Sequence, residues 1–92
     1  MNLNFPNESR SFDETRNRVR FWGYDGPIDI AFFVEADALK KLGQLSADMR
    51  GVEAGFLKIF DAAREQIYRV ADKVYARSRD GSYACSLVAA DF

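Results

Sequence analysis

In residues 18–34, strongly apolar side chains recur at every second position on either side of a short turn. This period of two constrains the fold more than any other feature of the sequence. Val19 and Phe21 alternate with Arg18, Arg20 and Trp22, and Ile28 to Val34 repeats the pattern. A period of two is typical of strands that bury one face. Two such runs separated by a short turn predict a β-hairpin.

The turn between the two runs sets the expected register. Asp25-Gly26 stands between them, and Asp-Gly is a favoured pair for a two-residue hairpin turn. With these two residues at the centre, Val19 is expected to pair with Phe32, and Phe21 with Ile30. One face of the hairpin would then hold the strongly apolar side chains.

The opposite face of the hairpin is the candidate functional surface of this chain. It is expected to carry Arg18, Arg20, Trp22 and Phe33. Arginine and tryptophan are enriched in the cores of protein interfaces, so the face could bind a protein or a second copy. Arginine interleaved with aromatic rings also suits single-stranded nucleic acid. A purely structural face, with arginine stems lying over the rings or under the N-terminal arm, is the third interpretation.

After the hairpin, the apolar period changes to that of helices. Residues 36–42 predict a short helix ended by Gly43, and Ser46 or Asp48 is a candidate cap for the next one. The following residues share one helical face: Phe56, Ile59, Phe60, Ala63, Ile67, Val70, Ala71 and Val74. They predict one helix of about 24 residues, roughly 36 Å long. Its apolar stripe fits the core of this chain, with packing against a partner helix as the alternative.

The ends of the chain add strands to this plan. Residues 79–82 predict a turn, and Tyr83 to Ala90 predict a strand covered on both faces. The residues up to Asn17 suggest an extended arm or a short edge strand, anchored by Leu3, Phe5 and Phe12. The expected fold is α+β: a small antiparallel sheet, made of the hairpin, the C-terminal strand and this edge strand, packed by one short and one long helix.

Size and composition exclude several classes of function. The chain has 92 residues, 13 Lys+Arg, 14 Asp+Glu and no histidine. We expect a single domain over residues 1–92, too small to enclose a deep pocket. Without histidine, the triads and metal sites that need an imidazole cannot be built. The near-zero net charge disfavours binding to nucleic acid or anionic membrane through bulk charge.

The remaining reactive groups suggest structural roles. Cys85 is the only cysteine and is expected to be a buried packing residue, and no intrachain disulfide can form. The carboxylate pairs Asp61 with Glu65 and Asp25 with Asp29 lack the ligand density of a calcium loop. We therefore expect no catalytic residues, metal or cofactor. The lone cysteine and the absence of a signal-peptide pattern or a long apolar run indicate a cytoplasmic protein.

The order and spacing of several short motifs resemble a family of short bacterial proteins, domain of unknown function family 1488. Its pattern is matched along the chain by Phe5-Pro6, Val19-Arg20-Phe21-Trp22, Asp25-Gly26, Ala38-Leu39, Phe60, Arg64, Ile67, Ala71, Gly81-Ser82-Tyr83 and Asp91-Phe92. Relatives often have Ser or Thr where this chain has Glu35, which caps a helix less well. The resemblance implies a small α+β fold and no reaction.

Together these observations predict a non-enzymatic interaction or accessory protein. We expect a homodimer, or a complex with another protein, formed through the outer face of the sheet, a sheet edge or the long helix. The alternative is a small nucleic-acid-associated regulator that uses Arg18, Arg20 and Trp22.

Overall fold

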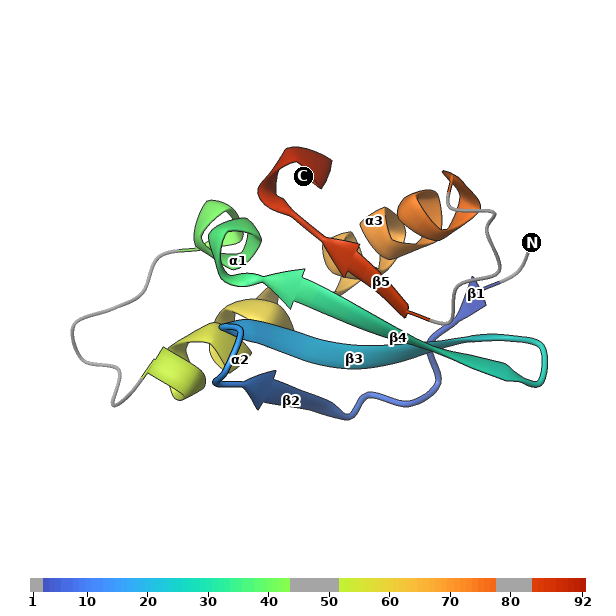
Figure 1. Cartoon of the computed structure of the whole chain (residues 1–92), viewed down its shortest axis with the longest axis horizontal. Coiled ribbons are helices and arrows are strands. Elements are labelled where there is room, and N and C mark those ends of the chain that lie inside the picture. The colour runs from blue at the N-terminus through green and yellow to red at the C-terminus, as the bar shows by residue number, and fades with distance from the viewer. Residues whose placement is uncertain (1–2, 44–51, 78–83) are drawn as a thin grey trace.

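A computed structural model of the chain describes residues 3–43, 52–77 and 84–92. The predicted caps at Ser46 and Asp48 and the predicted turn at residues 79–82 lie outside these ranges. The elements in chain order are β1 (Leu3–Asn4), β2 (Arg10–Asp13), β3 (Arg18–Asp25), β4 (Ile28–Glu35), α1 (Ala36–Leu42), α2 (Val52–Ala62), α3 (Arg64–Arg77), β5 (Ala84–Leu87) and a short 3₁₀ helix (Ala89–Asp91). Figure 1 shows their arrangement, and the α+β class is confirmed.

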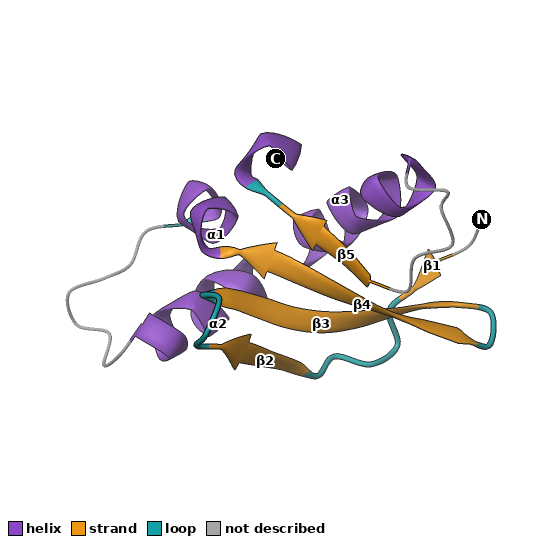
Figure 2. Cartoon of the chain, in the orientation of Figure 1, coloured by secondary structure: helices purple, strands orange, loops and turns teal. Residues whose placement is uncertain are grey.

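The hairpin of β3 and β4 is the centre of a five-stranded sheet. β4 is flanked by β3 and β5, whereas β3 pairs on its other edge with both β1 and β2. The N-terminal residues are therefore edge strands, as predicted (Figure 2). β5 runs parallel to β4, so the sheet is mixed and the prediction of an antiparallel sheet was wrong. A parallel neighbour needs a long crossover, and here the crossover contains α1, α2 and α3.

The hairpin register differs from the prediction by two residues. Val19 pairs with Val34 and Phe21 with Phe32, because the turn is formed by Gly26-Pro27. Gly26 has φ +61°, a conformation that glycine adopts without strain. Pro27 has no N–H and cannot donate to a strand partner, so the turn is a better place for it. A shift of two keeps every side chain on its predicted face.

The core lies between one face of the sheet and the helices. Every second residue of β3 and β4 points into it, and Phe21 and Phe32 are fully buried there. Their rings stack with centroids 5.2 Å apart, and Phe60 of α2 lies 5.2 Å from Phe21. The apolar stripe of the helices packs into this core and not against a partner helix, which is the arrangement that its spacing favours.

The predicted long helix is in fact two helices. α2 ends at Ala62 and α3 begins at Arg64. The amide of Ala63 is shared between the carbonyls of Ile59 and Phe60, at 3.0 and 3.2 Å, which is common at a helix end. Over residues 52–77 the structure therefore has two shorter helices in place of the single helix of roughly 36 Å that the sequence predicts.

Two smaller predictions have opposite outcomes. α1 spans Ala36–Leu42 with Gly43 as its C-cap, as expected. β5 is shorter than predicted and is covered on one face only, because Cys85 and Leu87 are buried whereas Ala84 and Ser86 are exposed. Cys85 is 7% exposed, which confirms its place in the core.

Candidate interaction surface

The face of the sheet opposite the core carries the four residues singled out from the sequence. We call it the outer face. Because β3 and β4 alternate, Arg18, Arg20, Trp22 and Phe33 all point to it. Arg20 lies directly opposite Phe33, and Trp22 directly opposite Ala31. The structure thus brings the predicted residues together.

Arg18 is held by its neighbours on this face. Its guanidinium lies 3.8 Å from the centroid of the Phe33 ring, within the range of a cation–π contact. Its Nε is 3.3 Å from Asp13 Oδ2 and its Nη1 is 3.9 Å from Glu35 Oε1. Only 15% of the side chain is exposed. The charge of Arg18 is therefore largely balanced within the chain.

Arg20 is the most exposed of these four residues, and its neighbour along β3 on the outer face is Trp22. The guanidinium of Arg20 lies 4.9 Å from the Trp22 ring. Arg20 is exposed, and among the described residues it makes no ion pair with a carboxylate. Trp22 is half-buried although it lies on the face away from the core. An aromatic ring and an unbalanced cation thus remain available at the centre of the sheet.

The small neighbours of Trp22 were not predicted as part of the surface. Ala31 pairs with Trp22 across β3 and β4, and Ala84 of β5 follows Ala31 in the same row. One row of the outer face therefore has a large side chain beside two small ones. The sequence could not place Ala84 in this row without the pairing of β5.

Acidic residues also lie on the outer face, among the arginines and aromatic rings. Glu35 and Asp29 alternate with the buried residues of β4, as Phe33 does. The period of two in the sequence was therefore enough to predict that both lie on the outer face. Asp13 joins them through the pairing of β2 with β3, which sequence alone did not provide. The face is consequently mixed in charge.

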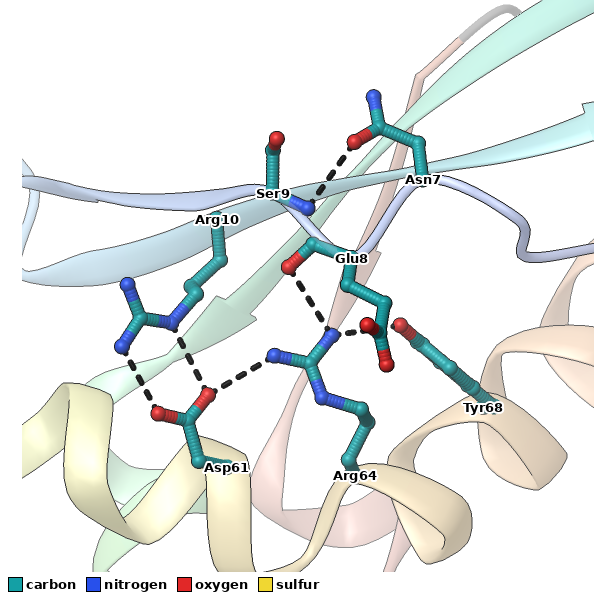
Figure 3. Close-up of polar contacts among 7 residues, drawn as sticks. All are labelled: Asn7, Glu8, Ser9, Arg10, Asp61, Arg64 and Tyr68. Carbon is teal, nitrogen blue, oxygen red and sulfur yellow. Dashed lines mark hydrogen bonds and ion pairs between the residues drawn. The ribbon is translucent and has the colours of Figure 1, made fainter.

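A second polar cluster, on the helix side, ties the N-terminal arm to the break between α2 and α3 (Figure 3). Arg10 donates two hydrogen bonds to Asp61, of 2.9 and 2.8 Å. Arg64 donates to Asp61 at 2.8 Å, to the Glu8 carbonyl at 3.1 Å and to the Tyr68 hydroxyl at 2.7 Å. This network bridges residues more than 50 positions apart and fixes the arm in place.

The network also lowers the pKa of the Asp61 carboxyl below its ordinary value. The main cause is the hydrogen bond from Arg10, and the bond from Arg64 adds to it against the opposing effect of partial burial. Asp61 is thus engaged with two guanidinium groups. The other carboxylate pair is separated, since Asp25 accepts a 2.8 Å bond from Tyr75 on the helix side whereas Asp29 lies on the outer face.

Two general features of the described residues bear on the possible functions. In residues 3–43, 52–77 and 84–92, no three His, Cys, Asp or Glu side chains are grouped so that they could hold a metal ion. Within the same ranges, none of the helices has the length and apolar character needed to cross a membrane.

The chain belongs to the family described as protein of unknown function DUF1488, whose model matches residues 3–87. The match covers β1 to β5 and includes the outer face. Neither a curated protein nor a solved structure matches the chain.

Proposed function

We propose that this protein is a non-enzymatic interaction module that binds a protein partner through the outer face, with Arg18, Arg20, Trp22 and Phe33 at its centre. The observation that carries the proposal is the half-buried Trp22 on the sheet face opposite the core, with the guanidinium of the exposed Arg20 4.9 Å from its ring. Tryptophan and arginine are the side chains most enriched at the energetic centres of interfaces. We place the protein in the cytoplasm, because its lone cysteine is buried and allows no intrachain disulfide.

The energetics of the face favour a partner that covers it. Burying a tryptophan removes 150–250 Å² of mostly apolar surface from water, about 4 to 6 kcal/mol at about 25 cal/mol per Å², before the cost of association. Trp22 is already half-buried, so a partner would gain part of this amount. Arg20 is held near the ring by the cation–π contact, and a partner that binds it loses less side-chain entropy.

The nucleic-acid alternative has less support from the same residues. Asp13 and Glu35 lie at 3.3 and 3.9 Å from Arg18, so its charge is not free for a phosphate. Of Arg18 and Arg20 on the outer face, Arg20 is then the one whose charge can contact a phosphate of the nucleic-acid backbone. A site of so few phosphate contacts gives weak binding with a shallow dependence on salt.

Site-specific photo-crosslinking in the native host tests the proposal. A photoreactive amino acid replaces Phe33 on the outer face, and in a matched control it replaces Arg69, which is exposed on α3. We expect the Phe33 probe to give a protein adduct of defined mass that Arg69 does not give. The double substitution R20A/W22A should abolish this adduct while the circular dichroism spectrum stays unchanged.

Two results would count against the proposal. If the adduct persists in the R20A/W22A variant, or forms equally from Arg69, the outer face is not the binding surface. If the Phe33 adduct is removed by nuclease, and a single-stranded oligonucleotide binds with a salt-dependent shift, the partner is nucleic acid.

A further inference from the structure

The outer face is built from cross-strand pairs of unlike side chains. Moving along β3 and β4, the rows are Arg18 with Glu35, Arg20 with Phe33, Trp22 with Ala31, and Tyr24 with Asp29. Each row combines a cation with an anion or a ring, a large side chain with a small one, or a hydroxyl with a carboxylate. The members of a row are therefore complementary to each other in charge or size.

We propose that the partner of the outer face is a second copy of this chain, packed face to face with the first. The two copies are related by a two-fold axis that lies between the two sheets, in front of the outer face. The axis runs parallel to the strands, over the line midway between β3 and β4. This inference rests on the proposed function. Such an axis places β3 of one copy over β4 of the other and keeps every row at the same height. Each side chain then meets the cross-strand partner that it already complements within its own chain.

Size complementarity is greatest in the row of Trp22. In this arrangement Trp22 packs onto Ala31 of the second copy, and Ala84 of that copy lies beside it, because β5 follows β4 in the sheet. Face-to-face sheets lie about 10 Å apart, which leaves room for a large side chain only where the opposite one is small. The two-fold axis forms this contact twice.

Charge selects this axis over the alternative. With the axis parallel to the strands, Arg18 meets Glu35 of the second copy and Arg20 meets Phe33 of the second copy. An axis perpendicular to the strands, placed so that Arg20 meets Trp22, brings Glu35 against Asp29 of the other copy. Centred on the Trp22 row, it brings Trp22 against its own counterpart. Like charges face to face and two bulky rings in one place are both unfavourable.

An exchange of the large and small residues tests the arrangement. We expect the wild-type protein to have twice the 10.5 kDa mass of the chain by light scattering. Trp22→Ala removes both large contacts and Ala31→Trp makes two rings collide, so each variant alone should dissociate about 30-fold more readily or worse. Mixing the two variants restores two Trp–Ala contacts and should restore a dimer that contains one chain of each.

A second measurement does not depend on the folding of Ala31→Trp. Ser11 and Ser86 are exposed at opposite sides of the outer face, each in the row of Arg20 and Phe33. The proposed axis places Ser11 opposite Ser86 of the second copy. A short bis-maleimide should therefore link Ser11→Cys to Ser86→Cys chains in a mixture and should link neither variant to itself.

The outcomes separate the arrangement from the proposed function. A wild-type protein that stays monomeric at every concentration overturns the second copy as partner and leaves the crosslinking test above to decide the function. A dimer that survives Trp22→Ala places self-association elsewhere on the chain. The dimer could also be lost in both single variants and not recovered in their mixture, while Ser11→Cys chains link to one another. That result refutes the proposed axis, but it still places the dimer contact on the outer face.

Discussion

Gly23 of β3 is the position where one added methyl group would test the packing of the N-terminal arm. The residue is buried on the core face of the sheet. A Cβ atom there would lie 2.8 Å from Phe5 Cε1 and 2.9 Å from Phe32 Cε2. Both distances are shorter than any ordinary carbon contact, so a ring must move in the variant Gly23→Ala.

Phe5 is the ring that we expect to move. Phe32 is fully buried in the centre of the core, whereas Phe5 is half-buried and belongs to the arm. Phe5 stacks on Tyr68 with centroids 4.1 Å apart and planes 6° from parallel. Its displacement would loosen this stack, which is a main apolar contact between the arm and α3.

Two opposing effects give the expected magnitude. Forcing an extra methyl into a packed core costs about 1 to 3 kcal/mol. Replacing glycine by alanine lowers the entropy of the unfolded chain and returns about 0.4 to 1 kcal/mol. We therefore expect Gly23→Ala to lower the free energy of unfolding by about 1 to 2 kcal/mol, a decrease of very roughly 4 to 16 °C in the melting temperature.

Urea unfolding followed by circular dichroism measures this loss, and a double-mutant cycle with Phe5→Ala identifies its cause. In the Phe5→Ala background one clashing ring is absent and Phe32 has space to shift, so the added methyl should cost clearly less. An unchanged or raised midpoint for Gly23→Ala would refute the reasoning. So would an equal loss in both backgrounds, because Phe5 would then not be the ring that yields.

Three further predictions concern the core and the arm. Asp61→Asn should cost less than about 1 kcal/mol at pH 7, because the ion pairs of Asp61 are partly exposed. The folded pKa of Asp61 is lowered, so this contribution is present above its unfolded pKa and lost as the pH falls through the folded value. The difference in free energy of unfolding between the wild type and Asp61→Asn should therefore be smaller at pH 3 than at pH 7. An equal difference at both pH values would contradict this prediction. Phe60→Ala removes a fully buried ring and should cost about 3 to 5 kcal/mol in urea unfolding, against less than about 0.5 kcal/mol for Lys58→Ala on the exposed side of α2. The thiol of Cys85 should react with a thiol reagent far more slowly in the folded protein than in urea, and equal rates would show that it is not buried.

The sequence was sufficient for the hairpin and its two faces, because a period of two is a local signal. The period of two does not determine the register of the hairpin. The register depends on which two residues form the turn, and both Asp25-Gly26 and Gly26-Pro27 are plausible. The missing N–H of Pro27 favours the second of these. Since the error was two residues, the predicted outer face remained correct.

The elements that the sequence did not predict depend on contacts between distant residues. Ala62 and Ala63 are good helix formers, so nothing local marks the break between α2 and α3. The direction of β5 depends on the path of the whole crossover. Asp13 and Ala84 reach the outer face only through the pairing of β2 and β5, so the charge and shape of the site could not be completed from the sequence.

The parallel pairing of β5 with β4 also has a consequence for how the chain is made. Phe32 pairs with Cys85, so roughly 50 residues and all three helices separate the partners. At about 5 to 20 residues per second, a ribosome needs about 3 to 10 s to synthesise that interval. The hairpin can form at its start, but one edge of β4 stays unpaired until β5 emerges. During these seconds the nascent chain is most exposed to pairing with the wrong strand.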